Sequence, residues 1–116
     1  MRKAHMAANV RKAGNAHVVD LQGPLTIGQP VEEFTFLLNE LLTADVRNLA
    51  VNLAGVPRID SSGIGAFVRA HTTVLRAGGK CRFFAAPKLV MQTLHMVRLD
   101  TVLDLAEDEA SALARF

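Results

Sequence analysis

Two stretches of the chain alternate apolar and polar residues with the period of a half-buried β-strand. They cover residues 17–22 and residues 47–54, and each is bounded by glycine or proline. Side chains of a strand point alternately to its two faces, so every second residue belongs to one face. The residues that share the apolar face are Val19 and Leu21 in the first stretch and Leu49, Val51 and Leu53 in the second.

Three longer stretches repeat apolar residues every three or four positions, which is the spacing of an amphipathic helix. The first begins at Pro30, carries Glu32 and Glu33 in its first turn, and continues to about Ala44. Proline at a helix start and acidic residues in the first turn both favour a helix beginning there. The expected buried positions are Phe34, Leu37, Leu38, Leu41 and Leu42.

The second helical stretch runs from Ser61 to Arg76, where Gly78-Gly79 provides a glycine C-cap. The third opens at Pro87. Their apolar stripes are Ile64, Phe67, Val68 and Leu75 in the second, and Val90, Leu94 and Val97 in the third, with His95 at a core margin.

The remaining elements are shorter. Residues 6–11 are expected to form a weak edge strand that pairs with residues 17–22 through a turn at Gly14-Asn15. Residues 80–84 and 101–105 are expected as short strands. Residues 107–109, all acidic, suit the first turn of a last helix that ends near Arg115.

This order of elements predicts an α/β fold. Two strands come first, and helices and strands then alternate to the end, which implies parallel strands joined by crossover helices. We expect a mostly parallel sheet of four to five strands, with one antiparallel strand at its edge, packed with four helices. The 116 residues make one domain. Residues 1–5 are expected as a flexible tail or artificial extension, and residues 6–116 as the folded domain.

Composition narrows the function classes. Half of the residues are apolar and the net charge is only +2, so the chain is globular and no direct nucleic-acid partner is expected. The chain has no Trp or Tyr for stacking on bases. No apolar run is long enough to insert into a membrane. The single Cys81 excludes an internal disulfide and fits a reducing compartment, so a cytoplasmic location is expected.

Catalytic and metal-binding patterns are absent. The four histidines have no ligand spacing and Cys81 has no CxxC partner, so no metal is expected. Neither Ser61 nor Ser62 lies in a GxSxG elbow, and no GxxxxGK[ST] loop occurs. We therefore expect no enzymatic activity and no cofactor.

The sequence is organised around residues 60–65, Asp-Ser-Ser-Gly-Ile-Gly, where the strand of residues 47–54 is followed by the helix that begins at Ser61. First-turn N–H groups lack partners within a helix and the helix dipole is positive at this end. Two interpretations remain open at this point. Ser61 or Ser62 caps the helix while Asp60 complements its dipole, or the two hydroxyls are displayed for chemistry by another protein.

The same stretch resembles the Asp-Ser-Ser-Gly-(Ile/Leu)-Gly motif of the STAS domain, the fold of bacterial anti-sigma factor antagonists. The similarity extends over most of the chain. Residues 18–26 resemble the family's second strand and following loop, residues 49–53 its strand before the motif, residues 78–80 its Gly-Gly turn, and residues 102–109 its tail.

The resemblance implies a switch protein that performs no catalysis. The first serine of the family motif is phosphorylated by an anti-sigma factor that is also a serine kinase, and a phosphatase removes the phosphate; this role falls on Ser61. The unphosphorylated form binds the anti-sigma factor and frees the sigma factor, which regulates transcription. The residues implied to contact the partner are Thr26, Asp60, Ser61, Ser62, Gly63, Ile64 and Gly65. Many family members have Asp where this chain has Thr26.

Two other functions fit the same resemblance. STAS domains also serve as non-catalytic adaptor subunits of lipid transporters or in stress-signalling scaffolds, where the serines would form only a cap and a docking surface. Some family members are thought to bind nucleotide, and the helix start at Ser62-Gly63 would be the place. A weak homodimer is left open.

Overall fold

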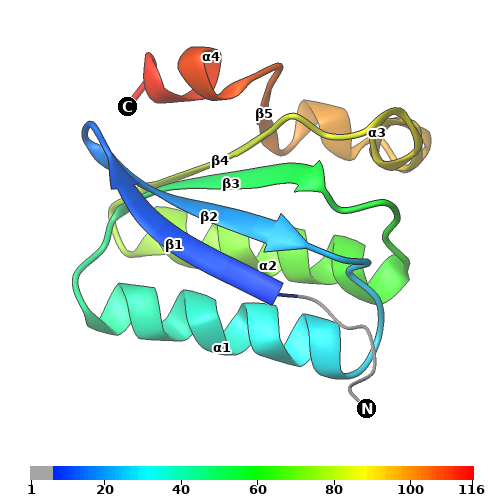
Figure 1. Cartoon of the computed structure of the whole chain (residues 1–116), viewed down its shortest axis with the longest axis horizontal. Coiled ribbons are helices and arrows are strands. Elements are labelled where there is room, and N and C mark those ends of the chain that lie inside the picture. The colour runs from blue at the N-terminus through cyan, green and yellow to red at the C-terminus, as the bar shows by residue number, and fades with distance from the viewer. Residues whose placement is uncertain (1–6) are drawn as a thin grey trace.

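A five-stranded sheet in the order β1-β2-β3-β4-β5 forms the centre of the structure (Figure 1). The computed structural model describes residues 7–116, and the tail predicted for residues 1–5 lies outside the described residues. The strands are β1 (Ala7–Ala13), β2 (Ala16–Gln22), β3 (Asn48–Gly55), β4 (Lys80–Phe84) and β5 (Asp104–Ala106). The helices are α1 (Gln29–Thr43), α2 (Ser61–Arg76), α3 (Lys88–Met96) and α4 (Glu109–Leu113), with a 3₁₀ turn at Leu99–Thr101.

The sheet has the predicted mixed pairing. β1 and β2 form an antiparallel hairpin, and β2, β3, β4 and β5 run parallel to one another. Gly14 adopts a φ of 60° in the turn between β1 and β2, a conformation that glycine reaches without a steric penalty. The edge strand expected for residues 6–11 is confirmed from Ala7 and extends to Ala13; Met6 lies outside the described residues.

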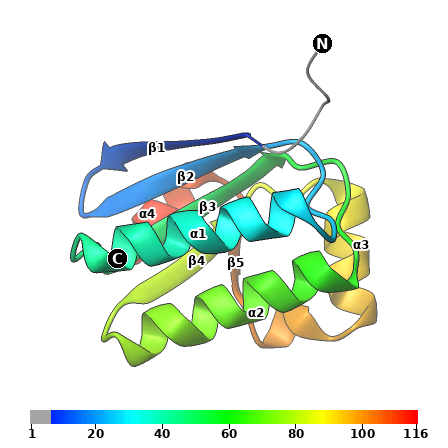
Figure 2. The same ribbon diagram turned by 90° about the horizontal axis from the view of Figure 1, so that it is seen from below.

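Helices α1 and α2 cover one face of the sheet, and α4 lies on the other (Figure 1, Figure 2). The face under α1 and α2 holds the main core. Phe67 of α2 is fully buried, with its ring centroid 5.9 Å from that of Phe34 and 4.8 Å from that of Phe83. On the other face, Ala112 of α4 packs into a smaller cluster with Val18, Ala50 and Phe84. The alternation predicted for β2 and β3 is therefore confirmed on both faces.

Three details of the expected helices are wrong. Leu75 of α2 is 57% exposed, because the helix presents Ala66, Phe67, Ala70 and Val74 to the sheet instead. Val97 lies past the end of α3 and is 49% exposed. His95 is exposed rather than at a core margin, and it pairs with Asp100.

The C-terminal boundaries also differ from the expected ones. Residues 101–105 do not form one strand, because a 3₁₀ turn occupies Leu99–Thr101 and β5 begins only at Asp104; Leu103, between them, is buried. Helix α4 begins at Glu109 with Asp108 as its N-cap, so Glu107 precedes the helix, and it ends at Leu113, before Arg115.

Candidate functional site

Two loops meet where β2 and β3 end, and their pairing builds the platform for the Asp-Ser-Ser-Gly motif. The Gly23 amide donates to the Gly55 carbonyl at 2.9 Å, and the Leu25 amide donates to the Arg58 carbonyl at 3.1 Å. Leu25 and Ile59 form an isolated parallel bridge, and both side chains are buried. The loop after β2 is therefore held against the segment that leads into α2.

Asp60 joins this loop to the start of α2. One carboxylate oxygen accepts the Gly63 amide at 2.9 Å and caps the helix, while the other accepts the Ile27 amide at 2.8 Å. The pKa of Asp60 is held below its ordinary value, first by the hydrogen bond from Ile27 and then by amides of the helix start, against the opposing effect of desolvation. The carboxylate is thus ionised at neutral pH.

Because Asp60 occupies the capping position, the interpretation in which Ser61 or Ser62 caps the helix is wrong. Ser61 is the first residue of α2 and is exposed, and Ser62 is half-buried. Within residues 7–116, neither hydroxyl is hydrogen-bonded to another residue. The Ser61 hydroxyl is therefore accessible and committed to no structural bond in the described part of the chain.

The two glycines of the motif have different surroundings. A Cβ atom at Gly63 would lie 2.3 Å from the Leu25 carbonyl oxygen, so only glycine allows α2 to approach the loop this closely. A Cβ atom at Gly65 would meet only Arg69 Nη1, at 3.2 Å, the end of a flexible side chain. Ile64, between the glycines, is half-buried against the main core.

The loop after β2 lies beside the motif. Thr26 is half-buried, and the next residue, Ile27, is 75% exposed. Sequence reasoning missed Ile27, although an isolated large apolar residue directly before Gly28 was a usable signal. Because its amide is bonded to Asp60, Ile27 keeps a fixed position next to the helix start.

Electrostatically, the helix start combines attractive and repulsive contributions for an added anion. The positive end of the α2 dipole favours negative charge at Ser61. The Asp60 carboxylate opposes it. Gly65 lies one helical turn after Ser61, and the Arg69 guanidinium lies alongside Gly65. Arg69 therefore places positive charge on the same helix. Sequence reasoning had not assigned Arg69 to the site.

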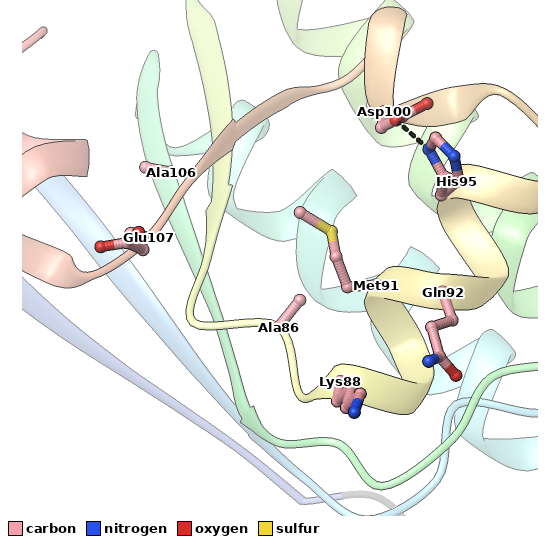
Figure 3. Close-up of a pocket in the computed structure, with 8 residues that line it drawn as sticks. All are labelled: Ala86, Lys88, Met91, Gln92, His95, Asp100, Ala106 and Glu107. Carbon is pink, nitrogen blue, oxygen red and sulfur yellow. Dashed lines mark hydrogen bonds and ion pairs between the residues drawn. The ribbon is translucent and has the colours of Figure 1, made fainter.

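A separate pocket lies away from the motif, between α3 and the segment that leads from β5 to α4 (Figure 3). Its volume is about 590 Å³. The Met91 side chain points into it from α3, and His95 Nδ1 lies 2.6 Å from Asp100 Oδ2 at its rim. No residue of the Asp-Ser-Ser-Gly motif lines this pocket.

Other reactive groups give no competing site. Within residues 7–116, no three His, Cys, Asp or Glu side chains gather as metal ligands would. Burial, reinforced by the negative charge of Asp104, raises the pKa of the Cys81 thiol to about 12, so Cys81 is not a nucleophile at neutral pH. Of the helices among the described residues, none has the length and apolarity needed to cross a bilayer.

The comparison with known families matches this arrangement. A family model for the STAS domain covers residues 7–112, which include both loops and the helix start. The chain belongs to the STAS family. The resemblance inferred from the Asp60–Gly65 motif is thereby confirmed, and so is the STAS-like fold. No curated protein matched the sequence.

Solved structures with the same fold include several anti-sigma factor antagonists. A Thermotoga maritima protein assigned to that class is 17% identical, with a TM-score of 0.86 over 93% of this chain and 92% of that one. An antagonist from Mycobacterium paratuberculosis is 16% identical, with a TM-score of 0.81 over 95% and 92%. Unphosphorylated SpoIIAA is 17% identical, with a TM-score of 0.73 over 94% and 96%. At such identities the likeness shows that the STAS domain here shares their fold.

Proposed function

We propose that this STAS protein is an anti-sigma factor antagonist that is switched off by phosphorylation of Ser61. In its unphosphorylated form it binds an anti-sigma factor that is also a serine kinase, and a phosphatase restores that form. The observation that carries the proposal is the exposed Ser61 hydroxyl, which the Asp60 cap leaves free at the first position of α2. The shared fold with SpoIIAA, whose structure is known in phosphorylated and unphosphorylated forms, supports it.

The partner surface in this proposal is the helix start together with the loop after β2. Ser61 and Ser62 present hydroxyls, and Thr26 and Ile27 lie on the adjacent loop that Asp60 holds in place. The exposed Ile27 offers apolar area to a partner, as large exposed apolar residues do at interfaces. In this proposal, the kinase and the phosphatase both act on Ser61 in the cytoplasm.

The physical basis of the switch is a local change of charge. A phosphate on Ser61 adds about −1.5 to −2 charges next to the Asp60 carboxylate. The α2 dipole softens the effect inside the domain, so the fold persists. At a desolvated contact, an unpaired charge costs roughly 2–5 kcal/mol. That loss lowers affinity about 30- to 5,000-fold, which is enough to exchange one partner for another.

A charge substitution tests this function directly. Ser61→Asp is expected to weaken binding to the cognate anti-sigma factor by at least about 30-fold while circular dichroism and thermal unfolding stay unchanged. Ser111→Asp is the matched control, because Ser111 is an exposed serine in the first turn of α4, on the opposite face of the sheet. The control is expected to bind like the unmodified chain.

Two results would count against the proposal. Equal affinity of the Ser61→Asp variant and the unmodified chain would show that the helix start is not the switched contact. Recovery of a transporter ATPase subunit in place of a kinase-type anti-sigma factor, with no effect of Ser61→Asp, would favour the adaptor function instead.

A further inference from the structure

Strand β1 has one neighbour in the sheet formed by the described residues, so one of its edges is open. Val10 packs against the main core under α1 and α2. Because side chains alternate along a strand, Ala8 and Lys12 point to this same face of the sheet. Arg11 points to the opposite face, where it bonds Asp20 and Glu109.

The hydrogen-bonding groups on the open edge follow from the hairpin register. Ala13 pairs with Ala16 across a two-residue turn, and in such a hairpin this pair exchanges hydrogen bonds. Alternate residues of β1 therefore bond to β2. The N–H and C=O groups of Ala8, Val10 and Lys12 point outward, available to another strand.

Next to this edge lies a groove between β1 and α1, with a volume of about 380 Å³. We call it the acidic groove, and its residues used here are Ala8, Phe36, Leu37 and Glu40; Glu33 also lines it but already accepts a hydrogen bond from Gln29 Nε2 at 3.2 Å. Phe36 is 65% exposed, and Glu40 is also exposed. The groove thus combines an exposed aromatic ring with the Glu40 carboxylate, directly beside an edge of β1 that pairs with no other described strand.

We propose that two copies of this chain associate by antiparallel pairing of their β1 strands. A two-fold axis perpendicular to the sheet places Val10 opposite Val10 and joins the outward N–H and C=O groups of both copies. Lys12 of the second copy then lies opposite Ala8 and on the α1 side, within side-chain reach of the acidic groove. Arg11 lies opposite Asn9, so no like charges oppose each other across the pair.

Charge complementarity is what selects a second copy as the occupant. A lysine on an edge strand normally opposes sheet extension, but here the pairing register carries it to the Glu40 carboxylate of the other copy. The interface is small, so the dimer is a weak one. The paired edge is also separate from Ser61, because α1 lies between β1 and α2, the helix that begins with Ser61 (Figure 2).

Sedimentation equilibrium of the full chain at rising concentration tests the proposal. We expect reversible dimerisation by about 0.5 mM, weakened at high salt. Lys12→Glu and Glu40→Lys are each expected to raise the dimer dissociation constant roughly three- to tenfold, and the double variant to restore it. Lys80→Glu, the same charge change at an exposed site on β4, serves as the control and is expected to leave it unchanged.

Ala8→Pro provides an independent variant, because the Ala8 amide points away from β2 and the hairpin does not need it. It is expected to be folded and monomeric. A chain that stays monomeric at about 0.5 mM would overturn the proposal, as would a dimer that Ala8→Pro leaves intact. If Lys12→Glu and Glu40→Lys change the dimer dissociation constant no more than Lys80→Glu does, the assigned register is wrong.

Discussion

At the scale of single residues, the geometry of the site depends on the Asp60 carboxylate. It accepts one amide from the helix start and one from the loop after β2, so two segments that are distant in sequence share one anionic acceptor. This arrangement leaves Ser61 with no capping duty. A modifying enzyme can therefore use the Ser61 hydroxyl without breaking a bond that holds the described fold together.

The first prediction concerns the pH dependence that Asp60 confers. Its pKa in the folded chain is lowered, so the carboxylate stabilises the fold above its unfolded pKa of about 4, and this contribution is lost as the pH falls through the lower, folded value. In the Asp60→Asn variant, the asparagine amide would still accept a hydrogen bond but could not titrate. We expect urea unfolding to show the unmodified chain losing stability relative to Asp60→Asn as the pH is lowered from about 5 to about 3.

Identical pH profiles for the two proteins would contradict this account of Asp60. The other acidic residues are the same in both chains, so they cancel in the comparison. A carboxylate whose folded pKa is depressed predicts that the difference in unfolding free energy between the two proteins narrows or reverses on acidification.

At the scale of elements, the closeness of α2 to the loop after β2 is the feature that positions the motif. The loop carbonyl of Leu25 lies against Gly63, where no side chain fits. Two residues later, Gly65 faces only the flexible end of Arg69. Alanine substitutions at these two glycines are therefore expected to affect the stability of the fold in opposite ways.

Gly63→Ala is expected to destabilise the fold by about 2 kcal/mol or more, because backbone must move to admit the methyl group. Gly65→Ala is expected to be neutral or to stabilise the fold by up to about 1 kcal/mol, since alanine is the better helix former. Thermal and urea unfolding of the two variants measure the contrast. Equal effects would show that the close approach at Gly63 does not constrain α2.

The elements that local patterns specify were predicted well from the sequence. Alternation in residues 17–22 and 47–54 gave β2 and β3, and Gly78-Gly79 marked the end of α2, because these signals act through neighbouring residues. The region after α3 was predicted less well. β5 has only three residues, and its position depends on pairing with β4 rather than on its own pattern.

The candidate site was likewise predicted where local residues determine it and missed where distant contacts do. The motif located the helix start and its serines. The cap could not be assigned, because Asp, Ser and Thr all cap helices well. What decides between them is the bond from Ile27 to Asp60, a contact across 33 positions of sequence. The apolar character of Ile27 could be read from the sequence, but its position beside the helix start depends on that contact.

At the scale of the whole molecule, Arg11 connects three distant segments on the face opposite the main core. Its guanidinium bonds Asp20 of β2 at 2.8 Å and Glu109 of α4 at 2.6 Å, and Asn52 of β3 donates to the same aspartate at 2.8 Å. The pKa of Asp20 and that of Glu109 are both lowered, chiefly by Arg11. This network holds the short helix α4 over the sheet.

Arg11→Met is therefore expected to loosen α4 while leaving α2 intact. Methionine keeps much of the apolar stem and removes the charge. Amide hydrogen exchange is expected to become faster in residues 109–113, and unchanged in residues 61–76. Unchanged exchange in α4 would show that the packing of Ala112 suffices to hold it.

The site and this network lie on different parts of the molecule, so a charge added at Ser61 changes one surface and leaves the core in place. The central claim of the proposed function is that an anti-sigma kinase phosphorylates Ser61, and the most direct measurement is incubation of the chain with the proposed kinase and ATP, followed by mass mapping. The account predicts one phosphate per chain, located on Ser61 and absent from Ser61→Ala. Phosphate found only at residues other than Ser61, or an equal level on the Ser61→Ala variant, would contradict it.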